Sequence, residues 1–160
     1  MATAIPAFIG YTEKGPLNTP VRITSIIEFT ETFGGAYHEL YEATINGSDE
    51  FVSAGPVTSE SPYTLFYHLQ MYFGNGGGPC HIVSVGSYTH TTTPSIVALD
   101  FYDPANPGNG IGAAELVDEV TLLVAPEVAE LTSDPQILSI YNAMLAQCNK
   151  LKDRFCIFDV

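Results

Sequence analysis

A run of glycines at positions 74–78, GNGGG, has the composition of a phosphate-binding loop. Such loops hold phosphate with backbone N–H groups at the N-terminus of a helix that follows a strand. Here the order is reversed, because the glycines follow a helical pattern and precede a strand pattern. The sequence also lacks the lysine of a GxxxxGK[ST] motif. The run therefore predicts the end of a helix and a turn into a strand.

The cysteines and one histidine are the candidates for a metal site. Cys80 and His81 are adjacent, so in a strand they point to opposite faces. Cys148 and Cys156 fall at apolar positions of a predicted helix and strand. A zinc site needs about four convergent ligands, so the pattern favours free, buried cysteines in a reducing compartment. We assign no metal ligand.

General acids, bases and nucleophiles are scattered rather than grouped. No serine lies in a GxSxG motif. Asp118 and Glu119 precede a predicted strand, where neighbouring side chains diverge, and we expect a solvated loop end. The histidines are spread along the chain at His38, His68, His81 and His90. Catalytic groups can be distant in sequence, so this weakens an enzymatic function without excluding it. We assign no catalytic or cofactor-binding residue.

The charge distribution restricts the possible partners. The 160 residues carry 18 acidic and 5 basic side chains, for a net charge of -13. Lys and Arg are absent from 23–149, whereas Lys150, Lys152 and Arg154 are close together. Such a surface repels phosphate and anionic lipid, so we expect no nucleic-acid or membrane binding. No signal peptide or apolar run of about 20 residues is present, and the length suits one domain.

The N-terminal third predicts a strand and a capped helix. Residues 4–11, AIPAFIGY, form an apolar β-type run, and 21–23 fit a short strand. Ser25 and Glu28 have the spacing of a capping box, in which the side chain of each residue accepts the backbone N–H of the other. The helix that they begin is expected to end at Gly34-Gly35.

A second helix and strand are predicted in the middle of the chain. Ser61 is a suitable N-cap, and Pro62 suits the first helical position. Apolar residues then recur at helical spacing up to Phe73, ahead of the glycine run. Residues 81–85, bounded by Pro79 and Gly86, have the composition of a strand.

Two long segments lack clear periodicity. Residues 37–58 are expected to form an exposed loop or insertion, with a hairpin around Asn46-Gly47. Residues 87–112 contain a Thr91-Thr92-Thr93-Pro94 run and a turn-rich DPANPGNGIG stretch. Connections of this length are usually insertions or exposed functional loops, and we expect both segments to be exposed.

The C-terminal third has the pattern of a βαβ unit. A helical turn is expected at 113–118, and the continuous apolar run 120–125 predicts a strand covered on both faces. Either Ser133 or Asp134 caps a long amphipathic helix. Residues 155–160, FCIFDV, give a second apolar strand, parallel to the first. Because the chain ends at such a strand and begins with apolar sequence, we expect it to be a piece of a longer protein.

Four stretches, in this order and across nearly all of the chain, resemble the phage tail sheath family, which includes the sheaths of contractile injection systems. They are AIPAFIGYTEKGPLNTPVRITSIIEF with a following FGG, then YFGNGGGPCHIVSVG, VDEVTLLVAPE and KLKDRFCIFDV. Each stretch is weak alone, and their order is what makes the resemblance specific.

The resemblance implies an α/β domain, with a partly parallel sheet flanked by helices, truncated from a larger sheath subunit. It implies a structural protein without cofactor or chemistry. Such a subunit polymerises as a helix around an inner tube protein and contracts to drive the tube through a target envelope. Terminal arms add strands to a neighbour's sheet in this family. The implied location is the bacterial cytoplasm during assembly and then the virion tail or injection particle.

Two other classes of function remain open on the sequence alone. A doubly wound domain could bind a small ligand or act as an enzyme at the carboxyl ends of its strands. An acidic adaptor would bind a basic partner in a salt-sensitive complex. The sheath interpretation differs from both in requiring self-assembly.

Overall fold

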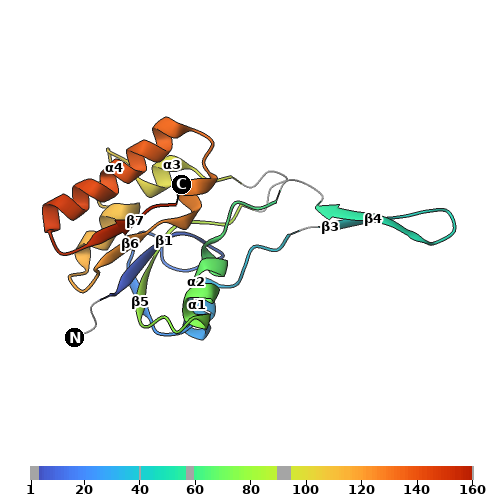
Figure 1. The fold of residues 1–160 in the computed structure, drawn as a ribbon, viewed down its shortest axis with the longest axis horizontal. Helices are drawn as coiled ribbons and strands as arrows, with labels where there is room; N and C mark the ends of the chain where they lie inside the picture. Colours follow the sequence, from blue (N-terminus) through green and yellow to red (C-terminus); the bar gives the residue numbers. More distant parts are fainter. Residues whose placement is uncertain (1–3, 40, 57–59, 90–94, 160) are drawn as a thin grey trace.

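A computed structural model describes residues 4–39, 41–56, 60–89 and 95–159, which fold into a body and a projecting hairpin (Figure 1). The strands are β1 (Pro6–Thr12), β2 (Val21–Ile23), β3 (Tyr41–Ile45), β4 (Phe51–Pro56), β5 (Cys80–Ser87), β6 (Leu122–Val124) and β7 (Phe155–Ile157). The α-helices are α1 (Ile26–Phe33), α2 (Leu65–Gly74), α3 (Ala98–Phe101) and α4 (Asp134–Leu151). Two 3-10 helices, η1 (Gly110–Leu116) and η2 (Pro126–Glu130), complete the body.

The body is built on a mixed sheet in the order β2-β5-β1-β6-β7. Strand β1 is parallel to β5 on one side and to β6 on the other, and β7 is parallel to β6. Strand β2 is antiparallel to β5 at one edge. The predicted α/β class, with a partly parallel sheet flanked by helices, is therefore confirmed, as is the C-terminal βαβ unit.

Side chains that alternate along the strands supply two apolar layers. On one face Ile9 and Leu123 pack with residues of α3, α4 and η1, including Phe101 and Met144. On the other face Phe8 and Ile82 pack with α1 and α2. Strand β1 is buried along its whole length because helices cover both of its faces.

The first predicted helix has the expected cap. The Ser25 hydroxyl accepts the Glu28 N–H at 3.2 Å. The Glu28 carboxylate accepts the N–H of Thr24 at 2.6 Å, one residue before the partner expected in a capping box. Gly34, at φ +88°, ends the helix, and its N–H donates to the carbonyl of Thr30.

The predicted start of the second helix is wrong. Helix α2 begins at Leu65 with Thr64 as its N-cap, not at Ser61 and Pro62. The Ser61 hydroxyl instead accepts the N–H of Tyr63 in a local turn, at 3.2 Å. The donors at the start of α2 go to a carboxylate distant in the sequence, that of Glu127. A tertiary partner therefore replaces the local cap.

The expectation of an exposed loop at 87–112 fails for much of its described part. Helix α3 and the start of η1 lie within it, and Phe101 and Ile111 are in the core. The Tyr11 hydroxyl holds the segment in place, since it donates to Asp100 at 2.5 Å and accepts the N–H of Val97 at 3.0 Å. The Thr91–Pro94 run lies outside the described residues.

The two C-terminal strands are shorter than predicted, and β7 is not buried. Strand β6 spans three residues rather than six, and β7 is the outer strand of the sheet. Phe155 and Ile157 are 75% and 53% exposed. An apolar run predicts burial on both faces, but here helix α4 covers one face of β7, through Cys156, and the other face is bare.

The hairpin expected around Asn46-Gly47 is present as the β3–β4 ribbon. The Asn46 side chain accepts the N–H groups of Ser48 and Glu50 at 2.9 and 3.0 Å, and Asp49 adopts φ +60°. All five residues of β3 are exposed. The ribbon extends away from the body, so it forms no part of the core (Figure 1).

Replacing residues 41–56 with a short Gly-Ser linker should leave the body folded. No core contact is lost, so we expect the melting temperature to change by less than about 3 °C. Thermal unfolding followed by circular dichroism measures this. A large fall in melting temperature would show that the ribbon stabilises the body.

Candidate functional site

Glu127 is the most unusual ionisable group in the described chain, because it is fully buried. It lies on η2, directly after β6. One carboxylate oxygen accepts the N–H of Tyr11 at 2.7 Å, and the other accepts the N–H of Leu65 at 3.0 Å. The carboxylate thus joins β1, the first turn of α2 and η2. The sequence analysis missed this residue.

Two features around β1 accompany the approach of Glu127. The β1–β5 register shifts between Gly10, which pairs with Ser84, and Tyr11, which pairs with Gly86, so the extra residue is Val85 of β5. A Cβ at Gly10 would lie 2.7 Å from the Glu127 Oε2 atom. Glycine at this position therefore allows the carboxylate to approach the strand.

Burial raises the pKa of Glu127 to about 8. The backbone N–H groups of Tyr11, Leu65 and Thr64 act in the opposite direction, because they stabilise the carboxylate. Desolvation is the larger effect. A perturbed carboxyl is a common sign of an active site, but this one is sealed from solvent and cannot meet a substrate.

Glu127 also fills the place where a doubly wound protein binds its ligand. Among the parallel strands, β5 is the next in the chain after β1 and lies on one side of it. The following parallel strand, β6, lies on the other side of β1, so the strand order reverses at β1. The crevice at the carboxyl ends of the strands at such a point is the usual ligand site. Here the protein's own carboxylate occupies it and caps α2, where a phosphate would be held. The ligand-binding alternative is therefore not favoured.

The glycine run behaves as predicted, as a helix end and turn. The N–H groups of Asn75, Gly76 and Gly77 donate to carbonyls of the last turns of α2. Gly76 adopts φ +84°, and a Cβ at Gly77 would lie 2.5 Å from the Tyr72 ring. These backbone N–H groups, which a phosphate would need as donors, are therefore already bonded to the helix.

Cys80 and His81 lie on opposite faces of the sheet, as predicted. Cys80 is buried against α1 and α2. His81 Nε2 lies 3.2 Å from Glu119 Oε1, and Arg22 Nε lies 3.2 Å from the same oxygen. Burial lowers the pKa of His81, while Glu119 raises it and Arg22 lowers it. Glu119 is half exposed, as expected for a loop end, but its ion pair with Arg22 on β2 was not predicted.

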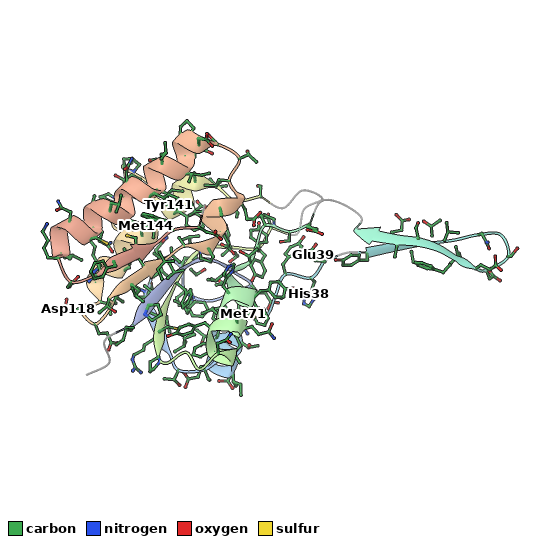
Figure 2. All side chains as sticks on the ribbon, in the orientation of Figure 1. His38, Glu39, Met71, Asp118, Tyr141 and Met144 are labelled. Carbon is green, nitrogen blue, oxygen red and sulfur yellow. The ribbon has the colours of Figure 1, made fainter. Side chains whose placement is uncertain are left out.

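The other histidines remain dispersed. His38 is exposed near the base of the ribbon, whereas Asp118 lies on a different side of the body (Figure 2). His68 Nδ1 lies 3.0 Å from the Thr64 carbonyl within α2. His90 is outside the described residues. Among the described residues no group of three or more His, Cys, Asp and Glu side chains could hold a metal ion.

Cys148 and Cys156 are brought together by α4 and β7. Their Sγ atoms are 3.1 Å apart, and both thiols are half buried. Burial raises the pKa of Cys156 to about 12, with a smaller contribution from Cys148. A high thiol pKa means little thiolate at neutral pH, so Cys156 does not resemble a nucleophile.

The basic residues near the C-terminus separate in the structure. Lys150 and Lys152 are exposed at the end of α4, and Lys150 pairs with Glu115 at 2.6 Å. Arg154 turns inward and donates to the carbonyls of Ala114 and Val117 at 3.0 and 3.3 Å. Arg154 therefore attaches η1 to the start of β7, whereas Lys150 and Lys152 have their partners on η1 and α4.

Four hollows on the described surface have volumes of about 190 to 240 Å³, below the roughly 300 Å³ at which small-molecule sites begin. The helices of the described part are too short or too polar to cross a membrane.

Comparisons with known proteins identify the fold. No family model and no curated protein matches the chain. A chain of the contracted helical sheath of the anti-feeding prophage is 22% identical with a TM-score of 0.57, over 100% of this chain and 34% of that one. A chain of the contracted baseplate of the same particle is 21% identical with a TM-score of 0.60, over 94% of this chain and 33% of that one. The chain thus has a sheath-domain fold and spans about a third of their length.

Glu127→Ala should lower the free energy of unfolding by about 3 kcal/mol or more, because two buried N–H groups lose their acceptor. Denaturant titration measures the change. Glu130→Ala is the matched control, since Glu130 is an exposed residue of the same 3-10 helix. Equal stability of the two variants would contradict this role of Glu127.

Stability should also fall as the pH rises from about 4.5 to 8. In this window the folded chain retains the Glu127 proton that the unfolded chain, with its ordinary pKa of 4.5, has lost. The loss of stability is complete above about pH 8 and absent below about pH 4.5. Comparing the pH dependence of unfolding with that of Glu127→Gln isolates this contribution, and identical slopes would contradict it.

Proposed function

We propose that the chain is a domain of a structural subunit of a contractile sheath. The subunit polymerises as a helix around an inner tube and contracts to drive the tube through a target envelope. The observation that carries the proposal is the match to the anti-feeding prophage helical sheath along the whole chain. The order of the four sheath-like sequence stretches supports the same assignment.

The site geometry agrees with a structural role. The carboxyl-end crevice is filled by Glu127, and the glycine run is bonded to its own helix. These groups hold elements of the fold together, and the Glu127 carboxyl is not exposed to solvent. We infer that the protein is not an enzyme and needs no cofactor.

The partners of the subunit follow from the proposal. They are other copies of the subunit and an inner tube protein, with assembly in the bacterial cytoplasm and final location in a tail or injection particle. The net charge of -13 disfavours nucleic acid as a partner.

A version of the chain extended at both ends to the length of the matched subunits should form tubes or rings, visible by electron microscopy. The 160-residue chain is the control, and we expect it to form none. Persistent failure of the extended chain to assemble, even with its tube protein present, would overturn the proposal.

A further inference from the structure

Cys148 on α4 and Cys156 on β7 form a pair of thiols in direct contact. Their Sγ atoms are 3.1 Å apart, and all three cysteines of the chain are free in the structure. The sulfur atoms of a disulfide are about 2.05 Å apart, so an approach of about 1 Å would join the two. The third cysteine, Cys80, is buried on β5 against α1 and α2 and lies apart from the pair.

Neither a metal site nor a catalytic nucleophile accounts for this pair. A structural zinc ion needs about four ligands, and in the described part of the chain no third His, Cys, Asp or Glu side chain completes a metal-binding group with the two thiols. Burial raises the pKa of Cys156 to about 12, which leaves little thiolate at neutral pH. Two adjoining thiols can still be oxidised to a disulfide, which needs no further protein group.

The pair lies where a covalent bond would have the most effect on the sheet. Strand β7 is three residues long and outermost, and within the described chain it pairs with β6 alone. Phe155 and Ile157 are mostly exposed, so their side chains add little burial. Cys156 between them faces α4, where it meets Cys148. A bond at this point would attach the outer strand to the helix that covers it, and both thiols are only half buried.

We propose that Cys148 and Cys156 form a reversible disulfide that fastens β7 to α4, with a small-molecule disulfide such as oxidised glutathione as the oxidant. One protein thiol loses its proton and attacks a sulfur of the small disulfide, which forms a mixed disulfide and releases one small thiol. The second protein thiol, also deprotonated, attacks the protein sulfur of the mixed disulfide and releases the other small thiol. The protein loses two electrons and two protons, and the small disulfide becomes two thiols.

The bond itself does not depend on the proposed function, but the time at which it forms rests on that function. Assembly in the bacterial cytoplasm would keep both thiols reduced, because the glutathione and thioredoxin systems of that compartment reduce disulfides. A particle outside the cell meets oxidising surroundings, in which a disulfide forms and persists. The bond would then strengthen the subunit after assembly.

Oxidation of the reduced 160-residue chain by oxidised glutathione tests the bond, at a mildly alkaline pH at which thiolate is more abundant. Thiol counting on the unfolded product should find one free thiol in place of three, and the intact mass should fall by two hydrogen atoms. Peptide mapping should find Cys148 joined to Cys156 and Cys80 free. Cys80→Ala is the matched control and should form the same bond. Cys148→Ser and Cys156→Ser should form no internal disulfide.

The disulfide should also raise the melting temperature, because it restricts the unfolded chain. The loop that it closes, 148–156, is short, so we expect a moderate rise of about 3 to 8 °C. Reduction with dithiothreitol should reverse the rise. The same oxidation should leave the melting temperature of Cys148→Ser and Cys156→Ser unchanged. Both replaced side chains are half buried, so these variants should fold, which circular dichroism checks.

Four results would overturn the inference: three thiols that survive oxidation, a reaction that stops at the mixed disulfide, a disulfide that includes Cys80, or a melting temperature that falls on oxidation. Failure of the bond is separable from failure of the proposed function. Retained thiols would leave the sheath function standing, since tube formation by the extended chain decides it. A disulfide in the 160-residue chain without tubes from the extended chain would do the reverse.

Discussion

The buried carboxylate of Glu127 is the interaction on which the rest of the body depends. It accepts backbone N–H groups from β1 and from the start of α2, which are 54 positions apart at Tyr11 and Leu65. Through it the central strand, the helix on one face and the end of β6 take a fixed relative position. Gly10 makes room for it, and the β1–β5 register shifts beside the Tyr11 N–H that it binds.

The same interaction supports the proposed role of this α/β sheet as a scaffold. A doubly wound sheet leaves a crevice where its strand order reverses, and a helix N-terminus beside it attracts anions. In this chain an internal carboxyl group, that of Glu127, fills that place and is buried.

Local signals in the sequence predicted the elements whose ends are determined locally. The Ser25 cap, the glycine stop after α2 and the turn at Asn46-Gly47 all depend on neighbours within a few residues. The start of α2 was mispredicted because Glu127, 62 positions away, displaces the Ser61 cap. No local pattern marks Glu127, since an acidic residue after an apolar strand usually faces water.

Other errors have the same physical origin. The segment 87–112 has the composition of a loop, but the Tyr11 hydroxyl fixes α3 through Val97 and Asp100. The apolar run at β7 predicted burial, yet composition does not reveal which strand is outermost or which face a helix covers. The pairing of β3 with β4, in which Val52 is an extra residue, likewise could not be read from composition.

The most direct test of the account is a helical reconstruction by electron cryomicroscopy of the polymer formed by the extended chain. The account predicts this domain in every subunit, with Glu127 buried against the first turn of α2. A map in which Glu127 turns outward and a small molecule occupies the start of α2 would contradict the scaffold assignment.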